Sequence, residues 1–138
     1  MVQEEVAERF CAKEGTAEYG SITAAIALKG TAKIVKRVSR NLFYPKPNVD
    51  SAVVKITFER GRVAVKSEKA YRQAVKCAFL NRRKTLENNL VNFFNLSRES
   101  AKKILAEAGV EEKARGETLS PQRLARLADT LVENGILS

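Results

Sequence analysis

Three cations stand in a row in the segment "FLNRRKTLENNL" (residues 79–90), immediately before an apolar pattern of helical period. Arg binds phosphate oxygens with a planar fork of donors, and Lys binds them as a mobile point charge. Arg82, Arg83 and Lys84 are therefore candidates for an anion site, to which free backbone N–H groups at a helix start could add. The alternative is a solvated corner between two helices, in which these charges bind nothing.

Positive charge is concentrated in the middle of the chain. The 138 residues carry a formal net charge of +9, and the sequence pI is about 9.8. From Tyr19 to Leu86 there are sixteen Lys and Arg against three acids, whereas the rest of the chain has nine basic and thirteen acidic residues. A central basic band is typical of a protein that binds nucleic acid, although a merely solvated basic surface would give the same count.

Cysteine and histidine usage excludes several kinds of site. Cys11 and Cys77 are far apart without C-x-x-C spacing, and the chain has no histidine. A His-ligated zinc site and a Cys–His nucleophile are therefore excluded, and no metal is expected. Both cysteines stand among apolar residues in helical patterns, so we expect buried, reduced thiols and a cytoplasmic location. We expect neither a secretory signal nor a membrane span, because no apolar run is long enough.

The elements that must position these residues fall into two groups. In the first group, helices are predicted over residues 4–13 and 21–28, and β-branched, alternating patterns predict strands over 32–38 and 51–58. In the second group, the predicted helices cover residues 67–80, 84–94, 98–108 and 121–134, with Ser97 and Ser120 as N-caps and with Gly109 and Gly135 at two C-terminal ends.

The predicted fold class is therefore α/β in front and all-α behind, with domains 1–62 and 63–138 and a boundary near residues 61–66. Four amphipathic helices can enclose a core of their own. Two helices and two strands leave long sheet edges, so we expect part of the front domain to be missing.

Four segments occur in the order and spacing of a known enzyme family. They read "VQEEVAERF" followed by "GTAEYGSIT" (residues 2–23), "LFYPKPNVDSAVV" (42–54), "FLNRRKTLENNL" (79–90) and "LSPQRLARLAD" (119–129). Through them the chain resembles the ribosomal RNA adenine dimethyltransferase family. The resemblance implies methylation of two adjacent adenines near the 3′ end of small-subunit rRNA, with S-adenosylmethionine as donor. It covers essentially the whole chain, but only the second half of a family member.

Parts of the family pattern have no counterpart in this sequence. In the family, the glycine-rich cofactor loop, the acidic residue that holds the ribose and the Asn-Leu-Pro-Tyr motif lie upstream of the position corresponding to Met1. The resemblance therefore implies a fragment: the last strands and helices of a Rossmann-like methyltransferase domain, followed by a small helical RNA-binding domain. Full-length members use S-adenosylmethionine, and we expect no cofactor to bind this chain alone.

The resemblance also implies roles for individual residues. Phe43, in the loop "RNLFYPKPNVD" (residues 40–50), matches the family's aromatic residue beside the target-base pocket and would stack on a flipped adenine. The alternative is that Phe43 or Tyr44 only fills a gap between strand and helix. The cluster Arg82, Arg83 and Lys84 matches residues that contact the rRNA backbone. Lys46 and Arg40 could extend this footprint, as could Lys29, Lys33, Lys36 and Arg37.

Two functions of different classes follow. In the first, the chain is the C-terminal portion of an rRNA adenine N6,N6-dimethyltransferase that acts on a small ribosomal subunit precursor; alone, it binds RNA without transferring methyl groups. In the second, it is a stand-alone RNA- or DNA-binding module with no chemistry of its own. An exposed sheet edge could also pair with a second copy of the chain.

Overall fold

The chain divides into two compact units, Met1–Arg62 and Val63–Ser138. The structure is a computed structural model that describes residues 1–59 and 63–138. Residues 61 and 62, with which the predicted boundary segment begins, lie outside the described residues. Each unit is described by itself below.

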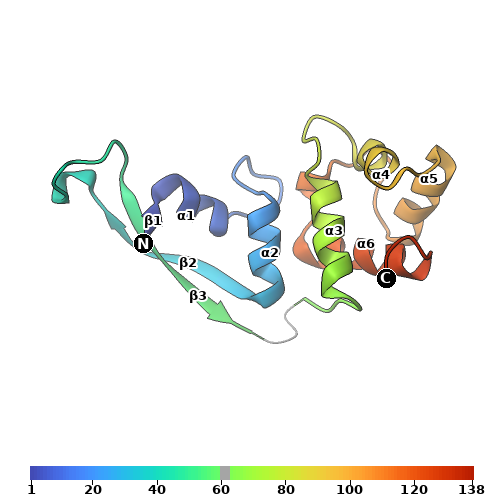
Figure 1. Ribbon diagram of the computed structural model, residues 1–138, viewed down its shortest axis with the longest axis horizontal. Coiled ribbons are helices and arrows are strands. Elements are labelled where there is room, and N and C mark those ends of the chain that lie inside the picture. Colours follow the sequence, from blue (N-terminus) through green and yellow to red (C-terminus); the bar gives the residue numbers. More distant parts are fainter. Residues whose placement is uncertain (60–62) are drawn as a thin grey trace. The chain divides into compact units, whose positions relative to one another are not determined.

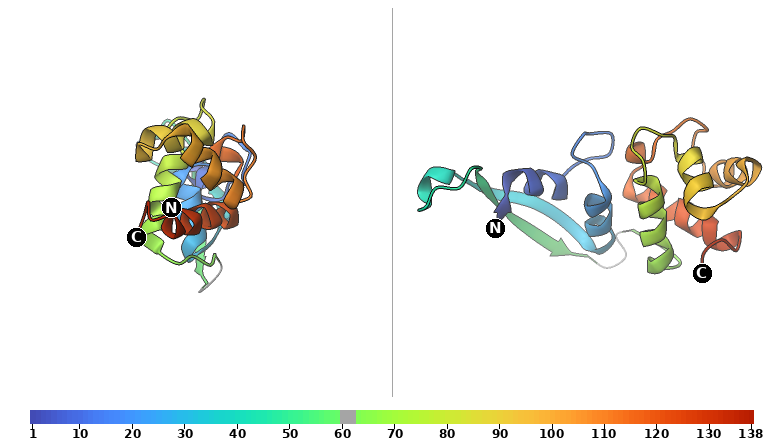
Figure 2. Two further views of the ribbon diagram at one scale, coloured as in Figure 1. Left: turned by 90° about the vertical axis from the view of Figure 1, so that its right-hand side faces the viewer. Right: turned by 45° about the horizontal axis from the view of Figure 1, so that its top comes forward.

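The front unit is a small antiparallel sheet with helices on one side. Its elements are β1 (Val2–Gln3), α1 (Glu4–Phe10), α2 (Ser21–Lys29), β2 (Gly30–Val38), a short 3-10 helix η1 (Arg40–Leu42) and β3 (Ser51–Phe58). The strand order is β1-β3-β2, and both pairings are antiparallel. Helices α1 and α2 lie on the same side of the β2–β3 ribbon (Figures 1 and 2).

The predicted strands are confirmed, and the structure adds a third. The sequence predicts two strands, whereas Val2 and Gln3 also pair with Ala52 and Ser51. Two residues are too few to show an alternating pattern, so no sequence signal marks β1. The prediction of a first helix through residue 13 is wrong at its end, because α1 ends at Phe10 and Cys11 is its C-cap.

Strand β3 is covered only at its beginning. Ala52 is fully buried, but along the same face Ile56 is 38% and Phe58 79% exposed. At that end Gly30 opens β2 so close to β3 that a Cβ atom on it would lie 1.9 Å from the carbonyl oxygen of Thr57. Only glycine fits there.

The back unit is a bundle of capped helices. Its elements are α3 (Glu68–Ala78), α4 (Leu86–Phe94), α5 (Arg98–Glu107), a short 3-10 helix η2 (Gly116–Thr118) and α6 (Pro121–Glu133). The predicted N-caps are confirmed, because the Ser97 and Ser120 side chains accept hydrogen bonds from the N–H groups of Ser100 and Arg123. Gly109 follows α5 with a φ of 71°, the left-handed conformation typical of a helix C-terminus.

The core of the back unit lies between the apolar faces of these helices. Helix α3 packs against α6, and α4 packs against α3 and α5. The largest fully buried side chains of this unit are Tyr71, Cys77, Leu86, Asn89, Leu90, Ile104, Leu105, Leu119, Leu124, Leu127 and Leu131. The opposite face of each helix is left for charged side chains.

Candidate nucleic-acid interface

The predicted cluster Arg82, Arg83 and Lys84 lies in the turn between α3 and α4. The sequence predicts a helix from residue 84, but α4 begins at Leu86. Thr85 is the N-cap, because its hydroxyl oxygen accepts a hydrogen bond from the N–H of Asn88 at 3.3 Å. The three cations therefore stand before the helix rather than in its first turn.

Two asparagines hold this turn in shape. The Asn81 side chain accepts a hydrogen bond from the N–H of Arg83 at 3.0 Å, and its carbonyl oxygen accepts one from Lys84 N at 3.2 Å. The fully buried side-chain amide of Asn89 donates to the carbonyl oxygens of Ala78 and Asn81, each at 3.3 Å. The end of α3 and the first half of the turn are thus fixed to α4.

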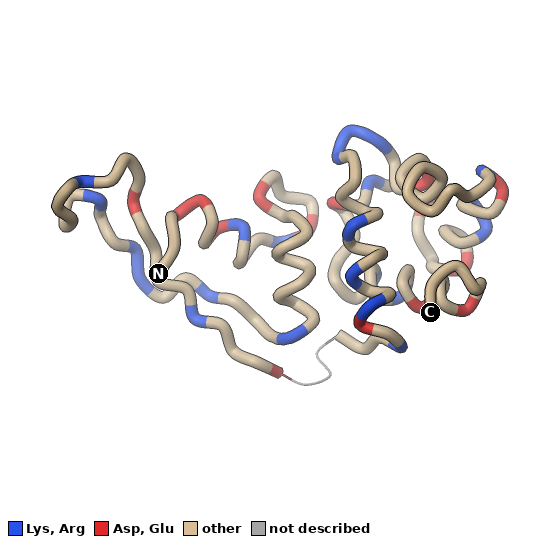
Figure 3. Tube along the Cα trace, viewed as in Figure 1, with Lys and Arg blue, Asp and Glu red and all other residues tan. Residues whose placement is uncertain are grey.

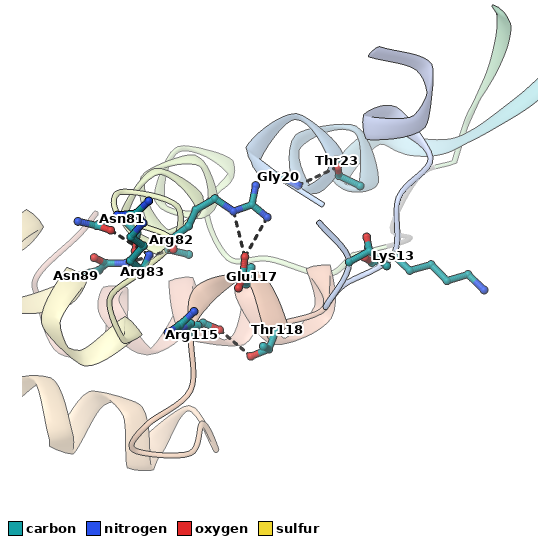
Figure 4. Close-up of polar contacts among 12 residues, drawn as sticks. Lys13, Gly20, Thr23, Asn81, Arg82, Arg83, Asn89, Arg115, Glu117 and Thr118 are labelled. Carbon is teal, nitrogen blue, oxygen red and sulfur yellow. Dashed lines mark hydrogen bonds and ion pairs between the residues drawn. The ribbon is translucent and has the colours of Figure 1, made fainter. Parts of the chain in front are cut away.

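Arg82 is held by contacts within the protein. Its Nε and Nη2 atoms lie 3.1 and 3.0 Å from Oε2 of Glu117, as Figure 4 shows. Its guanidinium carbon also lies 5.8 Å from the centre of the Phe79 ring, within the range of a cation–π contact. Glu117 reaches Arg82 because η2 abuts the end of α3: a Cβ atom on Gly116 would lie 2.1 Å from the Ala78 oxygen.

Arg83 and Lys84 differ from Arg82 in this respect. Both residues are exposed. Across residues 1–59 and 63–138, neither the Arg83 nor the Lys84 side chain forms an ion pair or a hydrogen bond. The structure therefore divides the predicted cluster into one internally neutralised arginine and two cations that are available to an anion.

The predicted aromatic loop lies in the front unit, between η1 and β3. Phe43 is half-buried there, whereas Tyr44 is 101% exposed. Arg40 braces this loop: its N–H donates to Asp50 Oδ1 at 2.8 Å and its Nη1 to the Asn48 oxygen at 2.9 Å. Lys46 is exposed. Arg40 thus shapes the loop that presents Phe43, and Lys46 faces solvent.

The cations on β2 that could extend the predicted footprint also differ in their contacts. Arg37 Nη1 lies 2.5 Å from Glu4 Oε1 and 3.5 Å from Glu8 Oε1, which ties β2 to α1. Lys33 and Lys36 are exposed on β2. Because two carboxylates neutralise Arg37, the number of lysines and arginines on β2 overstates the positive charge that this strand offers to a partner.

The two cysteines differ in burial. Cys77 is fully buried on α3, and burial raises the pKa of its thiol to about 12. The expectation that both are buried is wrong for Cys11, which is only partly covered because α1 ends just before it. Burial still raises the pKa of the Cys11 thiol above its ordinary value.

Sequence reasoning missed two residues that position the turn. Asn89 has a recognisable signal, since it is a polar residue on the face of α4 that also carries the buried Leu86 and Leu90. Glu117 has none, because its partner Arg82 is 35 residues away and no helical or strand period relates them. The Phe43 loop and the Arg83–Lys84 turn belong to different units.

No helix in the described part of the chain is long and apolar enough to cross a membrane. Among the same residues, no group of three or more cysteine, aspartate or glutamate side chains is placed to hold a metal ion.

Comparison of the sequence with known proteins identifies relatives of about twice its length. Ribosomal RNA small subunit methyltransferase A of Shouchella clausii is 46% identical over 136 residues, which are 95% of this chain and 45% of the relative. The protein of the same name in Geobacillus thermodenitrificans is 42% identical over 137 residues, which are 96% of this chain and 46% of the relative. The chain thus spans about half the length of the curated relatives it matches.

Comparison of the structure with solved structures gives the same fold. A dimethyladenosine transferase from Plasmodium falciparum matches with a TM-score of 0.75 and 21% identity, over 96% of this chain and 56% of that one. The 23S rRNA methyltransferase ErmE matches with a TM-score of 0.59 and 24% identity, over 94% of this chain and 52% of that one. The family model described as "Ribosomal RNA adenine dimethylase" matches residues 1–131. This chain therefore belongs to the ribosomal RNA adenine dimethylase family.

Proposed function

We propose that this chain is the C-terminal portion of an rRNA adenine N6,N6-dimethyltransferase and that it binds small-subunit rRNA. The observation that carries the proposal is the family match over residues 1–131. The substrate that the resemblance implies is a pair of adjacent adenines near the 3′ end of small-subunit rRNA, within a precursor of the small ribosomal subunit.

RNA binding is assigned to the exposed cations. Arg83 and Lys84 project from a turn whose backbone is fixed by Asn81 and Asn89. Such a turn presents two charges to phosphate at a low entropic cost, and it positions RNA without reading sequence. Lys46 adds a charge beside the Phe43 loop in the front unit.

Phe43 is assigned to the target base. An enzyme that modifies an adenine amino group must take the base out of its stack, and an aromatic ring can replace the lost neighbours. Phe43 is half-buried in a loop that Arg40 and Asp50 brace, so its ring is held in position. Base–aromatic stacking contributes about 1–3 kcal/mol.

The residues present do not fit S-adenosylmethionine. A nucleotide-like cofactor is usually held by a glycine-rich loop that follows a strand. Among the described glycines, Gly30 packs against the backbone of β3 and Gly116 against that of α3. The described chain has no glycine pair spaced for such a loop. The proposed activity of this chain alone is therefore RNA binding without methyl transfer.

A second candidate is a stand-alone nucleic-acid-binding module. The exposed Arg83–Lys84 turn favours it, because phosphate contacts need no cofactor and do not distinguish RNA from DNA. Competition between an rRNA hairpin and duplex DNA of equal length separates the two candidates: preference for the hairpin supports the rRNA enzyme, and equal competition supports the general module.

Self-association through the front sheet is a further part of the proposal. Strand β1 pairs only with Ala52 and Ser51, so the remaining six residues of β3 have no partner strand on that side within the described residues. Exposed Ile56 and Phe58 lie along this stretch. Unpaired edges with apolar side chains favour strand pairing between copies. Sedimentation equilibrium tests this, and a mass of one chain at every concentration would contradict it.

The decisive experiment is a salt titration of binding to a small-subunit rRNA 3′-terminal hairpin, with and without S-adenosylmethionine. We expect salt-sensitive binding that is indifferent to the cofactor. Changing Arg83→Gln and Lys84→Gln together should flatten the log–log salt slope by nearly two units. The matched control is Lys113→Gln with Arg126→Gln, which removes the same charges from other exposed positions. Equal slopes for the two variants would refute the assignment of the turn, and cofactor-dependent binding would refute the cofactor argument.

A further inference from the structure

Helix α3 carries a second set of cations on its exposed face. Lys69, Arg72 and Lys76 are all exposed, while Ala70, Tyr71, Ala74, Val75, Cys77 and Ala78 form the buried face of the same helix. Figure 3 shows these basic positions along α3 and, beyond its end, those of the turn. We call Lys69, Arg72 and Lys76 the α3 stripe.

The spacing of the α3 stripe places its charges in a line. Residues at positions i, i+3 and i+7 of an α-helix fall within an arc of about 60° and span about 10 Å along the axis. Arg72 has one acidic neighbour, Glu68, with Nη2 and Oε2 3.8 Å apart. Both side chains of this pair are about half or more exposed. Such a loose, solvated pair can be replaced by a phosphate.

The stripe and the turn together carry the positive charge of the back unit. From Glu68 to Lys84, which covers α3 and the turn, the sequence has six Lys and Arg against one acid, a balance of +5. From Thr85 to Ser138 it has seven against eight, a balance of −1. The excess charge of this unit therefore lies on α3 and the turn that follows it, and not evenly over the bundle.

The same surface offers little to unpaired bases. Single-stranded RNA is usually held by exposed aromatic rings on which bases stack. In residues 63–138, the one large hydrophobic side chain that is exposed is Leu80, and no aromatic ring is. Duplex RNA is bound mainly through its backbone and shape, for which a straight row of cations suffices.

We propose that the α3 stripe continues the Arg83–Lys84 turn and that the two together bind the phosphate backbone of double-stranded RNA. This inference rests on the proposed rRNA-binding function, which supplies RNA as the partner. It adds three contact residues that the family motif does not include, and it specifies a helical segment of the RNA rather than a loop.

The test compares variants with equal charge. The stripe variant is Lys69→Gln with Arg72→Gln and Lys76→Gln, and the matched control is Lys103→Gln with Lys113→Gln and Arg126→Gln, all at exposed positions. Binding to a short RNA duplex and to a single strand of the same length is measured by fluorescence anisotropy at several salt concentrations. A third variant, Lys69→Arg with Arg72→Lys and Lys76→Arg, keeps the charge.

For the stripe variant we expect a loss of at least about tenfold in duplex affinity at low salt. We also expect a log–log slope shallower by nearly three units, since each of the three phosphate contacts contributes just under one. The control and the charge-keeping variant should bind like the unchanged chain. Equal losses of duplex affinity in the stripe variant and the control would overturn this inference. The proposed function would still stand if the Arg83–Lys84 turn gave salt-sensitive binding. Loss of binding to the single strand alone would overturn the duplex assignment. No salt-sensitive binding by the unchanged chain would overturn both proposals.

Circular dichroism and thermal unfolding establish that each variant is folded. Glutamine retains good helix propensity at these exposed positions, so the melting temperatures should agree closely. If the stripe variant unfolds, the charge-keeping variant still tests the proposal. A large loss of duplex affinity in the folded charge-keeping variant would contradict a purely electrostatic contact with the RNA backbone.

Discussion

The three neighbouring cations of the turn between α3 and α4 differ in their contacts. The Arg82 side chain is held by Glu117 and Phe79, whereas within the described residues the side chains of Arg83 and Lys84 form no ion pair or hydrogen bond. We expect Arg82→Gln to lower the free energy of unfolding by about 1 kcal/mol, because a partly exposed ion pair and a cation–π contact each contribute up to about that much. Arg83→Gln should change it by less than about 0.5 kcal/mol and should reduce the RNA salt slope by about one unit.

Urea unfolding and the salt titration, made on the same two variants, check this separation. The control is Glu117→Gln, which removes the carboxylate that holds Arg82 and should destabilise the chain to the same extent as Arg82→Gln. A stability loss in Arg83→Gln, or none in Arg82→Gln, would show that the division of the cluster is incorrect.

The two thiols should react differently. Burial raises the pKa of Cys77 from the usual 9.0 to about 12, so at pH 8 this buried thiol is protonated and unreactive. Cys11 is only partly buried. We therefore expect mass spectrometry to find one alkylated cysteine, Cys11, in the folded chain and two after denaturation.

The same pKa shift links Cys77 to stability. The folded state holds its thiol proton more tightly than the unfolded state does, so this contribution is complete below about pH 9 and is lost as the pH rises towards 12. Rapid alkylation of Cys77 in the folded chain at pH 8 would contradict both statements.

At the scale of elements, Asn89 joins α4 to the end of α3. Its side-chain amide is fully buried and donates to the oxygens of Ala78 and Asn81. Asn89→Ala leaves those two oxygens without this donor, so we expect a loss of about 1–3 kcal/mol in stability and weaker RNA binding through a loosened turn.

Asn92→Ala is the matched control for this change, because Asn92 lies on the same helix but is exposed. Alanine is the better helix former there, so the unfolding midpoint in urea should stay the same or rise slightly. Similar midpoints for Asn89→Ala and Asn92→Ala would show that the buried amide does not hold the turn.

The helices of the back unit could be predicted because their caps are local signals. Ser97, Ser120 and Gly109 stand where the capping rules place them, and α5 and α6 end within a residue of the predicted limits. The start of α4 was misplaced because Lys84 was included in the helix, whereas Thr85 caps it. The Arg82–Glu117 pair depends on the contact between η2 and α3, and no local pattern encodes such a contact.

At the scale of the whole molecule, the two units differ in how completely they bury their apolar residues. The back unit leaves Leu80 as its one exposed large hydrophobic side chain among residues 63–138, whereas the front unit exposes Val35, Leu42, Tyr44, Ile56 and Phe58, among others. The sequence predicted long sheet edges from the small number of strands, but not the gradient of burial along β3. That gradient depends on where α1 and α2 lie on the sheet, which the spacing of apolar residues does not specify.

The prediction about methyl transfer rests on the residues of the front unit. The described residues of this unit have no glycine-rich loop after a strand, so we expect no transfer of label from S-adenosylmethionine to small-subunit rRNA by this chain. The assay should include the relative from Shouchella clausii, which is about twice as long, as a positive control. Salt-sensitive RNA binding measured on the same preparation would show that the chain is folded. If the chain is folded, labelled dimethyladenine above background would mean that its residues do form a binding site for S-adenosylmethionine. The proposal that this chain alone binds RNA without transferring methyl groups would then be wrong.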